Sequence, residues 1–223
     1  MLTFAVCLYR KDIFKAVCLP ALEQQQADHG VEVITTTDSR SIYYAYERLR
    51  RKASFGTVVY LHDDLQLMDK DTAPRVMRLM DSSGAGLMGV VGSKAGYRSI
   101  PWWETEGVGL WCHVKPSNDG VRFFDPERRI IRRVWTGQRA KKPFQPAECL
   151  DGIFMADRMD LPWPRRLGWH GYDAERSEQT REAGGEVYVG DVLVCHYNQP
   201  HDPDWGRSIA PIYQALRTEW GLE

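Results

Sequence analysis

The first half of the chain alternates short apolar runs with helix-like segments, and no other feature of the sequence restricts the fold as strongly. The strand-like runs are residues 2–8, 31–37, 56–61 and 86–91. The helix-like segments are residues 12–29, 42–49 and 74–80. Pro20 predicts a kink in the first helix, and Asp38 and Ser39 can cap the second. The alternation predicts an α/β fold, with a mostly parallel sheet and helices on both faces.

After Gly92 the sequence is richer in glycine, proline and aromatic residues, which indicates a mixed α+β second half. Its strand candidates are residues 108–114, 121–124, 130–135, 186–189 and 192–195. A helix is expected at 174–183, and a polar loop at 197–207 precedes a final helix. Because no linker or repeat separates the halves, we expect one domain over residues 1–223, divided at about residue 92 into a 1–92 half and a 93–223 half.

Charge and cysteine content exclude several classes of protein. The 29 Lys and Arg residues nearly balance 30 Asp and Glu residues, so the net charge of -1 gives no general attraction to nucleic acid or anionic membranes. Apolar runs are too short for a membrane span and no signal peptide is evident, which predicts a cytoplasmic protein. Five cysteines without a C-x-x-C pair argue against a disulfide framework and a structural zinc site.

Titratable side chains gather where strands end or helices begin. His62, Asp63 and Asp64 follow the apolar run that ends at Leu61, and ligands of open α/β sheets bind at the carboxyl ends of strands. Such carboxylates bind Mg²⁺ or Mn²⁺, or they simply form a turn or a cap. His196 likewise follows a strand-like run, and Asp173 stands at a helix start, where it can be a general base or a cap.

Four stretches of the sequence resemble, in the same order, nucleotide-sugar glycosyltransferases of the GT-A fold in the family-2-like group. They are VVYLHDDLQL (58–67), GLMGVVGS (86–93), ECLDGIFMA (148–156), and WHGYDAERSEQTREAGGEVYV (169–189) followed by VLVCH (192–196). Neither a P-loop nor a dinucleotide-binding fingerprint is present, which disfavours P-loop kinases and dinucleotide enzymes. The resemblance therefore implies a GT-A-like fold and a glycosyltransferase activity.

The resemblance also implies roles for individual residues. Asp64 and His196 would bind Mn²⁺ or Mg²⁺, with His62 in the place of the first acidic residue of the metal motif. Asp173 would be the base that deprotonates the acceptor hydroxyl, with Tyr172 replacing the glutamate that commonly precedes it. His62 and Tyr172 are thus two departures from the family pattern.

The resemblance assigns the first half to the donor and the second half to the acceptor. The donor-side residues are Tyr9, Thr37, Asp38 and Asp63. The acceptor-side residues are Asp151, Trp102, Trp103, Trp169 and His170. Tryptophan faces can stack on a sugar or a base, although core packing is the more common role for any single tryptophan. The loop at 197–207 is expected to close over the donor.

The sequence therefore predicts a metal-dependent, inverting glycosyltransferase that moves a sugar from a nucleoside-diphosphate sugar to the hydroxyl of a saccharide or small molecule. Three alternatives stay open. The basic segment from Arg128 to Lys142 could bind a nucleic acid acceptor that carries a modified base, or be a solvated face. The chain could also be a noncatalytic carbohydrate- or nucleotide-binding module, or a nucleotidyltransferase, because the fold alone does not exclude either.

Overall fold

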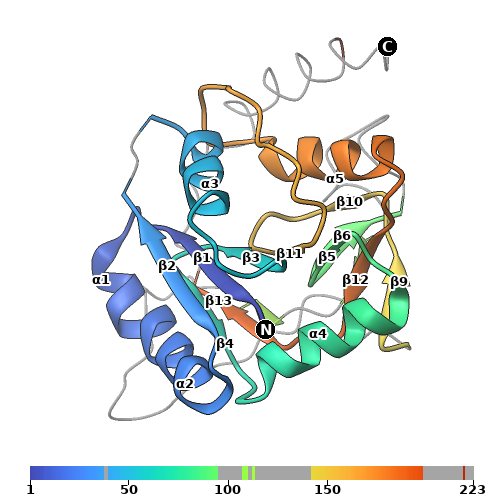
Figure 1. Cartoon of the computed structure of the whole chain (residues 1–223). Helices are drawn as coiled ribbons and strands as arrows, with labels where there is room; N and C mark the ends of the chain where they lie inside the picture. The colour runs from blue at the N-terminus through green and yellow to red at the C-terminus, as the bar shows by residue number, and fades with distance from the viewer. Residues whose placement is uncertain (38–39, 95–106, 110–111, 114–141, 198–217, 219–223) are drawn as a thin grey trace, which may run out of the picture.

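The computed structural model describes residues 1–37, 40–94, 107–109, 112–113, 142–197 and 218. Within these ranges the largest sheet contains seven strands (Figure 1). In spatial order they are β2 (Glu32–Thr36), β1 (Thr3–Cys7), β3 (Val58–Leu61), β11 (Phe154–Asp157), β5 (Leu87–Gly89), β12 (Val187–Gly190) and β9 (Phe144–Pro146). Strands β2, β1, β3, β5 and β12 run in one direction, and β11 and β9 run against them. The predicted mostly parallel sheet is confirmed.

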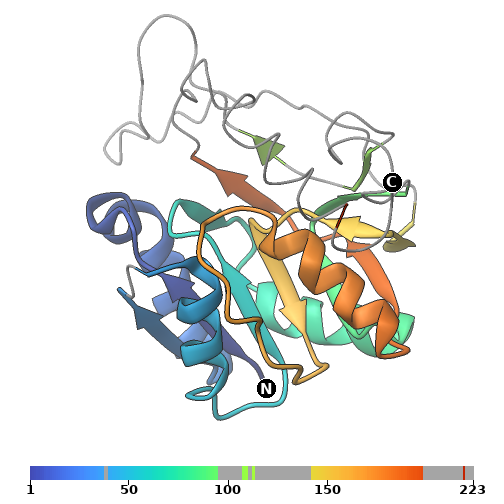
Figure 2. The ribbon, with the colours of Figure 1, turned by 90° about the horizontal axis from the view of Figure 1, so that it is seen from above.

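Helices cover both faces of this sheet, as the alternation predicts (Figures 1 and 2). One core joins the sheet to α2 (Leu19–His29) and α4 (Thr72–Ser83). The other core joins the opposite face to α3 (Ile42–Arg50) and α5 (Tyr172–Glu182), and it is rich in buried tyrosines. The result is a layered α/β/α fold whose two cores fix the ends of the strands in space.

Two small sheets extend the main one. The first contains β10 (Cys149–Leu150), β6 (Val91–Ser93) and β7 (Gly107–Gly109), and the second contains β4 (Leu65–Leu67), β13 (Val194–His196) and β8 (Cys112–His113). The prediction of one strand at 86–91 is therefore wrong. The chain instead forms two short strands, β5 in the seven-stranded sheet and β6 in the first of the small sheets. At this crossing Gly92 lies so close to β10 that a Cβ atom would stand 2.2 Å from the Cys149 carbonyl oxygen.

The first helical segment is irregular before Pro20, as expected. It begins as a short turn, α1 (Lys11–Ile13), continues as one π-helical turn, η1 (Phe14–Cys18), and becomes regular in α2. The Leu19 N–H bonds to the Phe14 carbonyl, five residues back. Proline has no N–H, and its ring crowds the preceding turn, so a widened turn relieves the clash.

The predicted cap of α3 is wrong in position. Ser41, rather than Asp38 or Ser39, precedes the helix, and its Oγ accepts a hydrogen bond from the Tyr44 N–H at 3.3 Å. A serine at this position satisfies one of the unpaired N–H groups of the first turn. Asp38 and Ser39 lie outside the described residues, as do the strand candidates at 121–124 and 130–135 and all of the final helix except residue 218.

A buried ion pair fastens α5 to the central sheet. Arg176 has no exposed surface, and its Nε donates to Asp157 Oδ2 of β11 at 2.6 Å. Its guanidinium carbon also lies 4.8 Å from the centre of the Trp163 ring. Removal of the arginine would leave a buried carboxylate without its partner cation, which is among the more destabilising changes known in protein cores.

We therefore expect Arg176→Met to lower the free energy of unfolding by about 3–5 kcal/mol. Urea unfolding followed by circular dichroism measures this difference. Arg51→Met is the matched control, since the Arg51 side chain is 66% exposed and its partner Glu47 keeps a second ion pair with Arg50 when Arg51 is replaced. An ion pair with so exposed a cation contributes at most about 1 kcal/mol. Equal losses in both variants would contradict the structural role assigned to Arg176.

Candidate functional site

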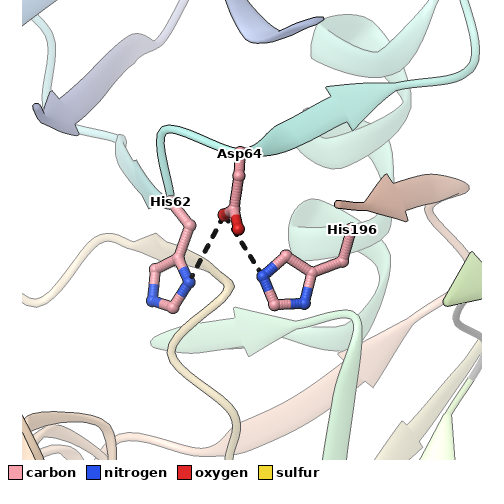
Figure 3. Close-up of side chains that lie close together, drawn as sticks. All are labelled: His62, Asp64 and His196. Atoms are coloured by element: carbon pink, nitrogen blue, oxygen red, sulfur yellow. Dashed lines mark ion pairs between the residues drawn. The ribbon is translucent and has the colours of Figure 1, made fainter. Parts of the chain in front are cut away.

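Two histidines and one aspartate from separate chain segments meet at the edge of the main sheet (Figure 3). His62 and Asp64 follow β3, whereas His196 ends β13. The antiparallel pairing of β13 with β4 sets His196 opposite Leu65, beside Asp64. His196 Nε2 lies 3.2 Å from Asp64 Oδ1, and His62 Nδ1 lies 3.9 Å from the same oxygen. The structure thus brings together all three predicted metal ligands.

The other carboxylate oxygen of Asp64 forms an ion pair with Arg10, a residue that the sequence did not single out. Arg10 Nη2 contacts Asp64 Oδ2, and the arginine side chain is 26% exposed. Arg10 follows Tyr9 just beyond β1, so its position after a strand end is a signal that could have indicated it. Its guanidinium adds a positive charge beside the three candidate ligands.

Asp63 shapes the loop that follows β1. It is buried, and its Oδ2 accepts the backbone N–H groups of Tyr9, at 2.7 Å, and of Arg10. Hydrogen bonds from two successive amides to one carboxylate hold this loop against the end of β3. The predicted donor-side residue Asp63 therefore acts on the loop that carries another donor-side residue, Tyr9.

Charges within the cluster set the ionisation of its members. Burial alone would raise the pKa of Asp64, but His196, His62 and Arg10 outweigh it and hold that pKa well below its usual range. Burial, His196 and Arg10 lower the pKa of His62 to about 4 against the opposing effect of Asp64. For His196 the carboxylates of Asp64 and Asp151 outweigh burial and raise the pKa.

The cluster fits a divalent metal ion. The ligand atoms of His62, Asp64 and His196 all lie within 4.8 Å of one another. Bond lengths of about 2.0–2.2 Å place adjacent ligand atoms roughly 3–4 Å apart, so small adjustments suffice. Apart from its ion pairs with the two histidines, the buried Oδ1 of Asp64 receives no hydrogen bond within the described part of the chain. One carboxylate and two imidazoles form a donor set typical of metals such as Mn²⁺ or Zn²⁺.

Asp173 lies in the first turn of α5 and is 7% exposed. Its Oδ2 accepts the Gly152 N–H at 3.1 Å, and its Oδ1 accepts the Ala174 N–H at 2.9 Å. Burial and the nearby charge of Asp151 raise the pKa of Asp173 to about 7, despite these hydrogen bonds. A carboxylate with this pKa can take up a proton from a substrate near neutral pH.

Asp151 links Asp173 electrostatically to the metal-ligand cluster. Its Oδ1 accepts the Ile153 N–H at 2.9 Å, and burial raises its pKa. The charge of Asp151 acts on both Asp173 and His196, because it raises the pKa of each. The candidate base also lies near the cluster in space, because the hydroxyl of Tyr172, the residue before Asp173, lies 2.7 Å from His62 Nε2.

The aromatic residues expected on the two sides of the site are only partly described. Tyr9 is 79% exposed and Trp169 is 37% exposed, and their ring centroids lie 6.2 Å apart. The structure thus joins one predicted donor-side residue and one predicted acceptor-side residue in an accessible aromatic pair. Thr37 is exposed just after β2, and the His170 carbonyl accepts from the Tyr43 hydroxyl at 3.4 Å.

Several predicted features lie outside the described residues. They are Asp38, Trp102, Trp103, the basic segment from Arg128 to Lys141, and the loop from 198 to 207. Of the described residues next to these segments, Lys142, at the end of the basic segment, is exposed, and Tyr197, before the loop, is buried. The nucleic acid alternative accordingly finds no support among the described residues. Across the same residues, every helix is too short or too polar to span a bilayer.

Solved structures similar to this chain define the fold. The crystal structure of GalNAc-T7 with UDP, GalNAc and Mn²⁺ matches with a TM-score of 0.57 and 11% identity, over 89% of this chain and 44% of that one. The Staphylococcus aureus protein TarS (residues 1–349), in complex with UDP-GlcNAc, matches with a TM-score of 0.53 and 10% identity, over 90% and 59%. This chain thus spans less than two thirds of either protein. Both likenesses show the GT-A glycosyltransferase fold.

The sequence agrees with the fold. A model of the "Glycosyltransferase like family" matches residues 3–204, so the chain belongs to that family. No curated protein matches the sequence. The resemblance to GT-A glycosyltransferases that the four sequence motifs indicate is therefore confirmed, both by the family and by the fold.

Proposed function

We propose that this protein is a metal-dependent, inverting glycosyltransferase that transfers a sugar from a nucleoside-diphosphate sugar to an acceptor hydroxyl. The observation that carries the proposal is the 2.7 Å contact between the Tyr172 hydroxyl and His62 Nε2, since Tyr172 immediately precedes Asp173 and His62 belongs to the metal-ligand cluster. A transferase of this kind needs a base for the acceptor and positive charge for the leaving diphosphate.

Asp64, His196 and His62 would hold the metal ion. When bound, a divalent cation stabilises the negative charge of the departing nucleoside diphosphate. Of the two expected cations, Mn²⁺ suits two imidazole ligands better than Mg²⁺, which prefers oxygen ligands and retains its waters. Both imidazoles must be neutral to bind, because a protonated imidazole has no lone pair to share. The lowered pKa of His62 favours that state, whereas the raised pKa of His196 means that metal binding would release a proton there at low pH.

Asp173 would take the proton from the acceptor hydroxyl as the acceptor oxygen attacks the anomeric carbon of the donor. Attack from the side opposite the leaving group inverts the configuration at that carbon, and no covalent sugar–enzyme intermediate is needed. The hydrogen bonds from Gly152 and Ala174 fix the direction of the carboxylate before substrate arrives.

The donor would bind to the half formed by about residues 1–92, with Tyr9, Thr37 and Asp38 near its nucleoside. The similar structures contain UDP or UDP-GlcNAc, so uridine diphosphate sugars are the first donors to test. The accessible pair of Tyr9 and Trp169 offers flat apolar surface to a base or a sugar. A saccharide or a small hydroxylated molecule is the proposed acceptor.

A thermal-shift screen tests the donor class directly. UDP, GDP, ADP and UDP-sugars are added with and without Mn²⁺, because a ligand that binds only the folded state raises the unfolding temperature. We expect a nucleoside diphosphate to raise it clearly, and only when Mn²⁺ is present. Absence of a shift with every nucleotide and metal would contradict the proposed donor site.

The pKa of Asp173 predicts the pH dependence of the reaction. The base must be deprotonated, so kcat/KM should rise with pH, level off above about pH 7, and fall about tenfold per pH unit well below it. Initial rates with saturating metal and a fixed donor, measured from pH of about 5.5 to 8.5, give this profile. A flat profile across that range would contradict the assignment of Asp173 as the base.

A further inference from the structure

Tyr172 connects the candidate metal ligands with the helix that carries the candidate base. It is the first residue of α5, is 6% exposed, and immediately precedes Asp173. Its hydroxyl oxygen lies 2.7 Å from His62 Nε2. The two nitrogens of the His62 ring thus face different residues. Nε2 contacts the Tyr172 hydroxyl, whereas Nδ1 lies 3.9 Å from the Asp64 carboxylate.

This hydrogen bond bears on which nitrogen of His62 carries the proton. A neutral imidazole has one N–H group and one lone pair. If Nε2–H donates to the tyrosine oxygen, the lone pair lies on Nδ1, on the side of Asp64 and His196. Histidine ligands of metals commonly depend on such a partner for both tautomer and ring orientation.

The ring of Tyr172 has little freedom to move away. It packs at edge-to-face or tilted angles against three buried aromatic residues, with ring centroids 5.6 Å from Tyr46, 6.4 Å from Trp163 and 6.5 Å from Tyr43. This aromatic cluster lies in the core between the sheet and the helices α3 and α5. The hydroxyl therefore stands at a fixed point beside His62.

Gly152 makes room for this arrangement. A Cβ atom at Gly152 would lie 2.1 Å from the Tyr172 hydroxyl oxygen, so any side chain would displace the tyrosine. The N–H of the same glycine donates to Asp173 Oδ2. One backbone segment thus contacts both the residue that orients His62 and the candidate base.

We propose that Tyr172 is a positioning residue that holds His62 with Nδ1 directed toward the metal. His62 and Tyr172 are the two departures from the family pattern noted in the sequence, and in the structure they contact each other. The inference rests on the proposed metal site and adds a residue that would act on the metal through His62.

The test is Tyr172→Phe, which keeps the ring in the aromatic cluster and removes only the hydroxyl. The dissociation constant for Mn²⁺ is measured from the electron paramagnetic resonance signal of the free ion, and we expect it to rise about 10–100-fold. Long-range ¹⁵N–¹H spectra of the metal-free protein should show His62 as the Nε2–H tautomer in the unsubstituted protein and as a mixture in Tyr172→Phe.

Tyr60→Phe is the matched control. Tyr60 is buried in the same core, with ring centroids 4.7 Å from Tyr46 and 5.2 Å from Trp163, so its variant loses a hydroxyl from the same cluster. Its Mn²⁺ affinity and His62 tautomer should stay unchanged. Gly152→Ala gives a second route, because it displaces the hydroxyl without removing it and should weaken Mn²⁺ binding similarly.

The possible outcomes separate this inference from the proposed function. The positioning role would be overturned if Tyr172→Phe, Gly152→Ala and the unsubstituted protein bound Mn²⁺ equally tightly and His62 kept the same tautomer in all three. That result would leave the metal site intact. An unsubstituted protein that binds no Mn²⁺ would overturn the metal site and this inference together.

Discussion

Replacement of Asp173 by asparagine is expected to lower kcat by about 10²–10⁴-fold and to leave donor affinity nearly unchanged. Asparagine keeps the size of the side chain and one acceptor oxygen, but it cannot take a proton from the acceptor hydroxyl. The loss should therefore appear in turnover rather than in binding. Initial rates over a range of donor concentrations, combined with donor titrations in a calorimeter, separate the two.

Stability distinguishes this loss from misfolding. Burial raises the pKa of Asp173 to about 7, so the stabilisation of its protonated form is present below the unfolded pKa and is lost as the pH rises through the folded value. At pH of about 8 the charged form is thus unfavourable in the fold, and the main cost of Asp173→Asn is the one backbone N–H that its amide nitrogen cannot accept. The loss in the free energy of unfolding should therefore stay within about 1–3 kcal/mol, too little to unfold the protein under assay conditions.

Glu178→Gln is the matched control for this experiment. Glu178 lies on the same helix, at the surface, where it pairs with Arg181. Its variant should retain full turnover. If Asp173→Asn kept turnover near that of the control, another residue would have to act as the base.

The second large effect is expected for Asp64→Ala. Asp64 supplies the only carboxylate among the three candidate ligands in the described part of the chain, and its loss should weaken Mn²⁺ binding by more than about 100-fold. Metal-dependent donor binding should disappear with it. Calorimetric titration of UDP with and without Mn²⁺ measures both effects.

The fold should tolerate this change. Arg10, the cation that pairs with Asp64, is partly exposed and can turn its guanidinium to water when its partner is removed. Asp71→Ala is the control, because Asp71 is an exposed carboxylate at the start of α4 that lies outside the cluster. Unchanged Mn²⁺-dependent donor affinity in Asp64→Ala would refute the assignment of the metal site.

Local patterns in the sequence predicted the layers of the fold well. Apolar runs of strand length alternate with helical spacing, and these are properties of a few neighbouring residues. The insertion of β11 between β3 and β5 was not predicted, since it pairs Val58 with Asp157 across the intervening chain. Pairing at this separation depends on tertiary packing, which a short window of sequence does not reveal.

The candidate site was predicted to a similar extent. Three of its residues follow or end strands, namely His62, Asp64 and His196. Because ligands of open α/β sheets bind at the carboxyl ends of strands, this position predicts that the three side chains lie at the same edge of the sheet. Arg10 was missed because one arginine after a strand is common, and its contact with Asp64 arises only when the loop after β1 folds onto Asp63. The contact between Tyr172 and His62 joins residues from distant parts of the sequence, and no local pattern marks it.

The central claim is tested most directly by incubating the protein with Mn²⁺, a panel of UDP-sugars and a mixture of saccharides, and recording ³¹P and ¹H NMR spectra after a chelating resin has removed the paramagnetic Mn²⁺. The proposed function predicts release of UDP together with a sugar product of inverted anomeric configuration, and loss of both signals in Asp64→Ala and Asp173→Asn. With a nucleoside triphosphate and a sugar 1-phosphate in place of the UDP-sugars, release of pyrophosphate would identify a nucleotidyltransferase instead. Binding of the donor without any turnover, with every metal tested, would contradict the claim and leave a noncatalytic binding module.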